Sequence, residues 1–211
     1  MERNALNYLE IIPIRHRSWV VKKFLNLIYY IFIANVIPKD LCESLIDECN
    51  KKEWKKHTWY DYGTNQSSSM PEKELDVMPC TQDQQNKITP HLIKALEDYQ
   101  NKYAVPGDKT GTKWLSKFSP IRFNKYPIGT MMRQHYDHIH SIFDGKMKGV
   151  PIISIVGQLN EDYEGAEFYC RDKEIKLKTG DILLFPSNFM YPHEVKETKK
   201  GVRYSFVSWA F

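Results

Sequence analysis

The sequence predicts a mainly β fold with packed helices (α+β): a jelly-roll barrel, or double-stranded β-helix, with N-terminal helices supporting one of its sheets. Three observations predict this fold. Eight short extended runs separated by Gly, Pro and Asn follow residue 120, two amphipathic helical stripes precede them, and 42% of the 211 residues are hydrophobic. Short strands with turns between them form a double sheet, and the helices would cover its outer face. The composition excludes a disordered or collagen-like chain.

We expect one domain in three parts. Residues 1–27 form an N-terminal extension, residues 28–120 a helical and strand support region, and residues 121–211 the double-stranded β-helix core. Within the support region we expect a mobile loop at 61–80, because residues 63–72 are polar, small and interrupted by proline. This loop is a candidate lid over a site.

The support region holds one expected strand and two expected helices. Residues 28–37 are rich in β-branched and aromatic side chains, which predicts a buried strand. A capping-box pattern at 40–43 and an apolar stripe at 41–49 predict the first helix. Thr89 and Pro90 fit N-cap and first-turn positions, and they predict the start of the second helix.

The core region changes to short extended runs bounded by turn residues. Such runs predict strands that pair with one another in an antiparallel double sheet. The expected strands are residues 121–126, 131–137, 151–159, 166–170, 174–178, 182–185, 190–195 and 202–210.

The charge and the cysteine content indicate which partners the protein could bind and in which cellular compartment it would lie. Thirty Lys and Arg against 26 Asp and Glu give a net charge of +4, and the basic residues are scattered among acids, so nucleic-acid binding is permitted but not indicated. No secretory signal is visible, and the apolar run at 24–37 is shorter than the roughly 18 to 20 residues of a membrane span. We therefore expect no membrane span. The four cysteines contain no CxxC pair, which indicates buried thiols in a reducing cytosol and a cytoplasmic protein.

Three side chains show the pattern of a metal site. In the run at 131–137, strand alternation sends His135 and Asp137 to the same face. His193 lies on a later expected strand that sheet pairing would bring beside them. Two imidazoles and one carboxylate on one side of a metal are the ligand set of non-haem Fe(II) oxygenases, which leaves positions open for a cosubstrate and O2.

A cation follows ten residues after His193. Strand alternation places Arg203, Ser205 and Trp209 on one face, the side that would hold a ligand inside the barrel. An inward arginine needs an anion, because a buried unpaired charge is costly. Its guanidinium and the neighbouring hydroxyl match the distal carboxylate of a dicarboxylate such as 2-oxoglutarate, whose keto-acid end would chelate the iron. The alternative is a structural arginine that pairs with an acid at the barrel mouth.

From about residue 121 to residue 211 the chain resembles the Fe(II)- and 2-oxoglutarate-dependent dioxygenases, in particular the prolyl 4-hydroxylase-like branch with its small bacterial and phage members. A weaker resemblance covers residues 28–49. The matching segments are RFNKY at 122–126, Gly129, HYD at 135–137, QLNEDYEG at 158–165, GDILLFP at 180–186, His193 and GVRYS at 201–205. The resemblance implies that His135, Asp137 and His193 bind Fe(II). It further implies that Arg203 holds the distal carboxylate of 2-oxoglutarate and that the hydroxyl of Tyr126 contacts the same cosubstrate.

Two positions depart from the prolyl hydroxylase pattern. Arg203 stands where collagen-type enzymes usually carry lysine, although oxygen-sensing and many microbial relatives carry arginine. Gln158 stands where some relatives have tyrosine, so Gln158, like Ser205, is a candidate contact to 2-oxoglutarate. Trp209 and Tyr136 are candidates for the substrate side, on the basis of strand alternation.

The resemblance implies that an unactivated C–H bond is hydroxylated while O2 and 2-oxoglutarate are consumed and succinate and CO2 are released. It also implies ascorbate as reductant and no catalytic acid or base from the protein. The expected substrate is a polypeptide, with a prolyl residue as first choice, in the cytoplasm of the cell or, for a phage protein, of its host.

Three alternatives stay open. They are the same chemistry on a nucleic acid or a small molecule, a non-catalytic metal-binding jelly-roll protein, and a zinc hydrolase. His138 and His140 prompt the last alternative, but the order of ligands differs from that of two-zinc hydrolases. We expect both histidines in the loop after the strand.

Overall fold

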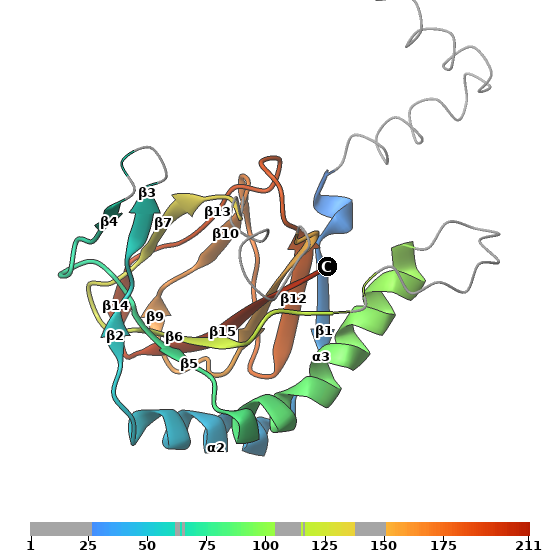
Figure 1. The fold of residues 1–211 in the computed structure, drawn as a ribbon, viewed down its shortest axis with the longest axis horizontal. Coiled ribbons are helices and arrows are strands. Elements are labelled where there is room, and N and C mark those ends of the chain that lie inside the picture. Colours follow the sequence, from blue (N-terminus) through green and yellow to red (C-terminus); the bar gives the residue numbers. More distant parts are fainter. Residues whose placement is uncertain (1–26, 62–63, 65, 104–114, 116, 138–150) are drawn as a thin grey trace, which may run out of the picture. The chain divides into compact units, whose positions relative to one another are not determined.

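The computed structural model describes residues 27–61, 64, 66–103, 115, 117–137 and 151–211 (Figure 1). The chain divides into two compact units, Met1–Ile31 and Phe32–Phe211. In the first unit, the described residues form the 3-10 helix η1, Leu27–Tyr30, where the rings of Tyr29 and Tyr30 meet edge to face. The rest of the expected extension 1–27 lies outside the described residues. All other elements belong to the second unit.

Seven antiparallel strands form the larger sheet of the second unit, in the order β1-β12-β8-β15-β6-β5-β2. The strands are β1 (Phe32–Asn35), β12 (Asp181–Pro186), β8 (Ile153–Gln158), β15 (Arg203–Ala210), β6 (Arg122–Tyr126), β5 (Asp76–Pro79) and β2 (Lys55–Lys56). The eight-residue strand β15 lies in the middle and pairs with β8 on one side and with β6 on the other.

Four strands form the smaller sheet, which faces the larger one in Figure 1. Its order is β11 (Lys173–Glu174), β10 (Phe168–Cys170), β13 (His193–Val195) and β7 (Met132–His135). Two short ribbons complete the unit: β9 (Glu164–Gly165) with β14 (Thr198–Lys200), and β3 (Trp59–Asp61) with β4 (Gln66–Ser68). The two opposed antiparallel sheets confirm the predicted mainly β fold with packed helices.

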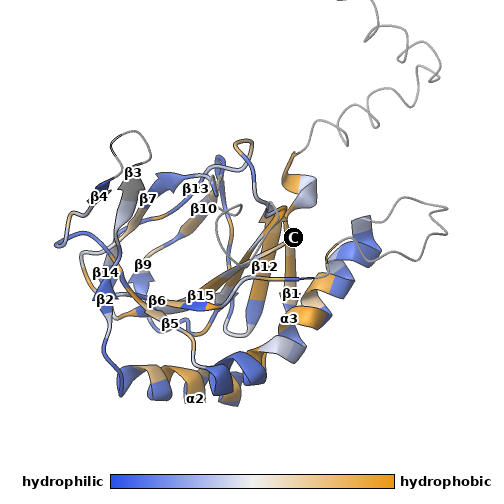
Figure 2. Ribbon diagram, viewed as in Figure 1, coloured by the Kyte–Doolittle hydropathy of each residue, from blue (hydrophilic) through white to orange (hydrophobic). Residues whose placement is uncertain are grey.

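Two helices, α2 (Lys39–Asn50) and α3 (Gln82–Tyr103), lie on the outer face of the larger sheet (Figure 1). Hydrophobic and hydrophilic residues are interspersed along each helix (Figure 2), and the buried residues of both helices belong mainly to the hydrophobic core. Leu45 of α2 and Leu92 of α3 are fully buried in one cluster with Leu184 of β12 and Phe206 of β15. This layer is the main hydrophobic core, and it leaves the other face of the larger sheet to the barrel interior.

Strand β15 shows how one strand serves both layers. Tyr204 and Phe206 turn to the core under the helices, whereas Arg203 and Ser205 line a cavity between the two sheets. The period of two along a strand produces this division. Gly157 on the neighbouring strand β8 makes room for the ring of Phe206, because a Cβ there would lie 2.1 Å from ring carbons.

Helix α3 begins eight residues earlier than predicted. Thr81 and Gln84 form the capping box: the hydroxyl of Thr81 accepts from the Gln84 backbone N–H at 3.4 Å, and the Gln84 side chain accepts from the Thr81 N–H at 3.1 Å. Thr89 and Pro90 therefore lie inside the helix, and the prediction that they start it is wrong. Helix α2 also begins before Asp40, at Lys39, without a side-chain cap.

The support region differs from the prediction in two further places. The expected strand 28–37 is shorter, because residues 27–30 form η1 and the strand itself is Phe32–Asn35. The expected loop 61–80 contains strands β4 and β5, and β5 pairs with β6 in the larger sheet. Burial of Met78, which is 4% exposed, anchors β5.

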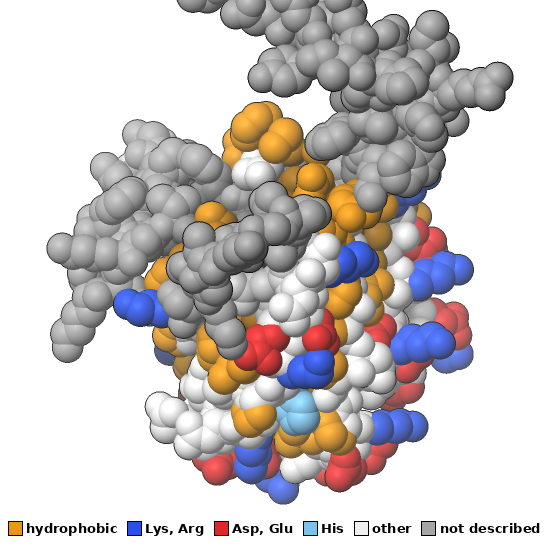
Figure 3. Space-filling model, turned by 90° about the vertical axis from the view of Figure 1, so that its right-hand side faces the viewer, with side chains coloured by type: hydrophobic (Ala, Val, Ile, Leu, Met, Phe, Trp, Pro, Cys, Tyr) orange, Lys and Arg blue, Asp and Glu red, His pale blue; other side chains and the backbone are white. Residues whose placement is uncertain are grey.

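Basic and acidic side chains are interspersed on the face shown in Figure 3, as their scatter along the sequence suggests. In the described part of the chain, neither helix combines the length and the apolar character needed to cross a bilayer. The division of the chain at residue 120 into a support region and a core stays a prediction.

Candidate active site

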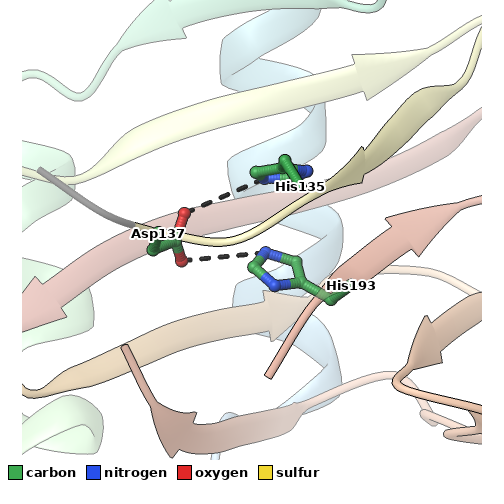
Figure 4. A group of neighbouring side chains, drawn as sticks. All are labelled: His135, Asp137 and His193. Atoms are coloured by element: carbon green, nitrogen blue, oxygen red, sulfur yellow. Dashed lines mark ion pairs between the residues drawn. The ribbon is translucent and has the colours of Figure 1, made fainter. Parts of the chain in front are cut away.

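His135, Asp137 and His193 converge at one end of the smaller sheet (Figure 4). His135 is the last residue of β7 and His193 the first of β13, and the two are direct cross-strand partners. Asp137 follows His135 by two residues. Its Oδ1 lies 3.8 Å from His135 Nε2, and its Oδ2 lies 3.7 Å from His193 Nε2. The structure thus brings together the three residues that the spacing predicts.

Backbone carbonyls orient both imidazoles. His135 Nδ1 lies 2.9 Å from the Arg133 carbonyl oxygen, and His193 Nδ1 lies 3.1 Å from the Tyr191 carbonyl oxygen. Each Nδ1 therefore carries the proton and donates it, which leaves an Nε2 lone pair on the side of Asp137. Metal-binding histidines are commonly held in this way by their second nitrogen. The donor set fits one divalent ion, since all three ligand atoms lie within 4.8 Å of one another.

The electrostatics also suit a cation. Burial, reinforced by the neighbouring His193, lowers the pKa of His135 to about 4, so its imidazole is neutral near pH 7. Burial alone would raise the pKa of Asp137, but the two histidines and the Ser154 hydroxyl together lower it below its usual value. Asp137 is therefore a carboxylate at neutral pH. Metal binding requires a neutral imidazole and an ionised carboxylate of this kind.

Two serines hold the carboxylate of Asp137. Ser154 on β8 donates its hydroxyl to Asp137 Oδ2 at 2.6 Å, and Ser187 Oγ lies 2.6 Å from Ser154 Oγ. Because Ser154 has one proton and uses it on Asp137, Ser187 must be the donor to Ser154. Both serines are buried. These two hydrogen bonds, which run through Ser154 of the larger sheet, fix the orientation of the Asp137 carboxylate.

A second group of side chains packs against His135. The indole of Trp59, on β3, meets the His135 ring edge to face at 5.3 Å between centroids. Its N–H donates to Glu74 Oε1 at 2.9 Å, and Glu74 Oε2 lies 3.3 Å from His57 Nδ1. The Arg133 guanidinium lies over the other part of the same indole, 4.3 Å from the ring centroid. These contacts hold the Trp59 indole in place beside the candidate metal site.

Arg203 lies deep in the barrel with an incomplete set of partners. It is 1% exposed, and its Nε and Nη2 both donate to Gln158 Oε1, at 3.1 and 2.8 Å. Its Nη1 and the hydroxyl of Ser205 have no hydrogen-bond partner among the described residues. The ring of Tyr126 lies 5.1 Å below the guanidinium. A buried guanidinium with one unpaired nitrogen and a buried hydroxyl, both without a partner among the described residues, fit the distal carboxylate of a dicarboxylate.

One cavity joins this arginine to the metal-ligand candidates. The three ligand candidates, Arg203, Ser205, Tyr126 and Trp209 all line it, and its other lining residues are Arg122, Asn124, Met132, Ile155, Val156, Phe168, Val195 and Val207. A larger hollow between α2 and residues 159–162 lies elsewhere on the unit and contains none of these side chains.

The remaining residues considered in the sequence analysis are Gln158, Tyr136, His138 and His140. The amide of Gln158 is used by Arg203 on one side and by Asn160 O and Tyr163 Oη on the other, and Gln158 does not line this cavity. The structure thus makes Gln158 a partner of Arg203. Tyr136 is 51% exposed and also lies outside the cavity lining. His138 and His140 lie outside the described residues.

The comparisons with known proteins agree with this geometry. Residues 121–211 match the family model of the 2OG-Fe(II) oxygenase superfamily. This part of the chain, which is less than half of it, is thus similar to the 2OG-Fe(II) oxygenases. The family and the His-Asp-His group together imply Fe(II) as metal and 2-oxoglutarate as cosubstrate.

Curated proteins similar to part of this chain carry the name PKHD-type hydroxylase. The protein of Aliarcobacter butzleri (strain RM4018) is 35% identical over 95 residues, which cover 41% of this chain and 41% of that protein. The protein of Janthinobacterium sp. (strain Marseille) is 31% identical over 108 residues, covering 44% and 43%. The similarity thus spans less than half the length of these relatives.

Solved structures similar to this chain confirm the jelly-roll fold. A prolyl-4-hydroxylase of Pseudomonas putida superposes with a TM-score of 0.61 at 21% identity, over 92% of this chain and 97% of that chain. A prolyl hydroxylase from Trichoplax adhaerens, solved in complex with a hypoxia inducible factor oxygen degradation domain peptide fragment, has a TM-score of 0.62 at 16% identity, over 100% and 94%.

Residues 121–211 also contain site residues that the sequence analysis did not identify. Arg122 lines the cavity, and Ser154 and Ser187 hold Asp137. For Arg122 a signal was present, since strand alternation puts it on the same face as Tyr126. Trp59 and Glu74 precede residue 121 and give no such signal, because their place near β7 depends on how the chain around the β3–β4 ribbon folds back.

Proposed function

We propose that the protein is an Fe(II)- and 2-oxoglutarate-dependent dioxygenase that hydroxylates an unactivated C–H bond in a residue of a polypeptide, with a prolyl residue as first choice. One observation carries the proposal: a single cavity connects three convergent metal-ligand candidates to a buried arginine that lacks an anionic partner among the described residues.

Each side chain has a role in this proposal. His135, Asp137 and His193 would hold Fe(II) through two nitrogens and a carboxylate oxygen. Arg203 and Ser205 would bind the distal carboxylate of 2-oxoglutarate, Tyr126 would contact the same cosubstrate, and Gln158 would keep the Arg203 guanidinium in place. Bound there, the metal supplies the redox chemistry by which O2 and 2-oxoglutarate yield succinate, CO2 and a hydroxylated product.

The protein's own contribution is to position the reactants and to limit access of water. Trp209 lines the cavity and is a candidate for the substrate side, and the indole of Trp59 closes the flank beside His135. Tyr136, which lies between His135 and Asp137 in the sequence, remains a proposed contact to the substrate outside the cavity. No side chain would have to act as a general acid or base, because the metal held by His135, Asp137 and His193 would supply the oxidative chemistry.

The polypeptide part of the proposal rests on similarity. One structural neighbour is described as bound to a peptide fragment, and two neighbours are described as prolyl hydroxylases. We further propose ascorbate as the reductant that keeps the iron ferrous, and a reducing compartment such as the cytoplasm, consistent with four free cysteines.

The test is 2-oxoglutarate turnover with Fe(II) and ascorbate, followed by mass spectrometry of peptides incubated with the protein. We expect slow succinate release without substrate, its loss in H193A, and its retention in H91A, a histidine of the outer helix α3. Peptides that gain one oxygen would identify the substrate. Absence of succinate from protein with verified iron loading would contradict the proposal. Oxygen gain in nucleosides or metabolites alone would assign the same chemistry to another substrate class.

A further inference from the structure

The active-site cavity contains a second arginine, Arg122. On β6 the side chains of Arg122, Asn124 and Tyr126 share one face, and in the register with β15 Tyr126 opposes Arg203 while Arg122 opposes Val207. Tyr126 and Arg122 are four residue steps apart along β6, which is about 13 Å at the usual rise per residue. The two guanidinium-bearing positions therefore mark opposite ends of the cavity.

Arg122 is a partly buried cation with few polar contacts among the described residues. Its Nε donates to Asn124 Oδ1 at 3.1 Å, and its Cζ lies 6.0 Å from the ring centroid of Trp209. Among the described residues, no acidic side chain forms an ion pair with it. Burial lowers the pKa of Arg122, and the nearby Tyr126 and Asp137 offset part of this effect. An arginine stays charged in proteins, and its guanidinium can donate to an anion through more than one N–H.

The metal-ligand candidates lie nearer to the Arg122 end of the cavity. Trp209 is the cross-strand partner of Ser154, and Ser154 donates to Asp137. A 2-oxoglutarate molecule held at Arg203 would reach toward the metal from the other end. Arg122 and Trp209 thus lie toward the end of the cavity away from Arg203, the end that 2-oxoglutarate held at Arg203 would leave to the primary substrate.

We propose that Arg122 binds a carboxylate of the primary substrate, so that the enzyme acts on a polypeptide residue that has an acidic neighbour. The proposal rests on the proposed function, because it assumes that 2-oxoglutarate occupies the Arg203 end. A guanidinium presents a planar fork that matches a carboxylate, and the indole of Trp209 supplies an apolar surface for the target residue beside it. A nucleic acid is less suited, since its backbone needs several cations in a row and the basic residues here are scattered.

The test is peptide binding to protein loaded with Mn(II) and N-oxalylglycine, a stable mimic of 2-oxoglutarate. A random peptide library is panned against wild type, R122Q and K125Q. Lys125 lies on the same strand but on the opposite face, over the rings of Trp54 and Tyr204, so K125Q removes an equal charge outside the cavity. We expect Asp and Glu to be enriched in peptides captured by wild type and by K125Q, but not by R122Q.

A second measurement separates binding from folding. R122Q should bind the tightest acidic peptide about 10- to 100-fold more weakly than wild type does. When the Asp or Glu of that peptide is changed to its amide, the affinity of wild type should fall by the same factor. The affinity of R122Q should not fall further. R122K, which keeps the charge, should retain part of the preference. Thermal melting of each loaded variant checks that it is folded.

Three results would overturn the proposal. They are a captured set without acidic enrichment, an enrichment that R122Q shares, and an affinity for N-oxalylglycine that R122Q lowers as R203Q does, which would assign Arg122 to the cosubstrate. Succinate release without substrate, measured on the same preparations, reports the proposed function separately. If it is absent from wild type, the dioxygenase proposal fails, whereas the acidic preference is still decided by binding.

Discussion

Replacement of Ser154 by alanine tests how the larger sheet supports the metal site. In the structure its hydroxyl donates to Asp137 Oδ2 at 2.6 Å and accepts from Ser187 at 2.6 Å. S154A removes a hydrogen bond to a charged group and leaves a buried Ser187 hydroxyl without its acceptor. A bond to a charged partner contributes about 1.5–3 kcal/mol. Loss of such an outer partner typically weakens metal binding by roughly 10- to 100-fold.

The assay is calorimetric titration of the metal-free protein with Mn(II) over a range of pH. Besides weaker binding, S154A should lose metal at a higher pH than wild type. The Ser154 hydroxyl is one of the groups that lower the pKa of Asp137. Removing this hydroxyl raises the pKa of Asp137, so protons compete with the metal for the carboxylate at a higher pH.

Ser208→Ala is the matched control. Ser208 is an equally buried serine on β15, but its hydroxyl donates to the Ser119 carbonyl oxygen at 2.8 Å on the other side of the sheet. S208A should lower stability without changing metal affinity or its pH dependence. Equal Mn(II) affinities for wild type and S154A would refute the reasoning that this hydroxyl positions the ligand.

Three further predictions concern the supporting structure. W59F keeps a ring beside His135 but removes the donor to Glu74, so urea unfolding should show a loss of about 1–3 kcal/mol, and an unchanged midpoint would contradict the buried hydrogen bond. G157A should cost about 1–3 kcal/mol because its Cβ meets the Phe206 ring, and the double variant with F206L should recover stability; additive losses would argue against the contact. Burial raises the pKa of the Cys170 thiol to about 12, so at pH 8 mass spectrometry should find it alkylated only after unfolding in urea, and rapid labelling of the native protein would show that the thiol is accessible.

The parts of the site that follow from strand alternation were predictable from sequence. His135 and Asp137 share a face, as do Arg203, Ser205 and Trp209, because the period of two is a property of the extended chain itself. The residues that meet across strands were less accessible. Register determines that Trp209 opposes Ser154 and that His193 opposes His135, and register depends on the whole sheet.

The errors in the support region have local causes. A Thr-Pro pair resembles a helix start, but the capping box at Thr81 and Gln84 initiates α3 earlier, and the buried stripe through Leu92 carries the helix past Pro90. The polar segment 61–80 resembles a loop, yet β5 within it gains backbone hydrogen bonds to β6 and buries Met78. Tertiary pairing overrides composition in both cases.

The most direct test of the account is a crystal structure of the protein with Mn(II) and 2-oxoglutarate, with the metal located by its anomalous signal. The account predicts one metal ion bound by His135 Nε2, His193 Nε2 and an Asp137 carboxylate oxygen, with the distal carboxylate of 2-oxoglutarate on Arg203 Nη1 and Ser205 Oγ. A metal bound elsewhere, or a 2-oxoglutarate molecule that leaves Arg203 without an anion, would contradict it.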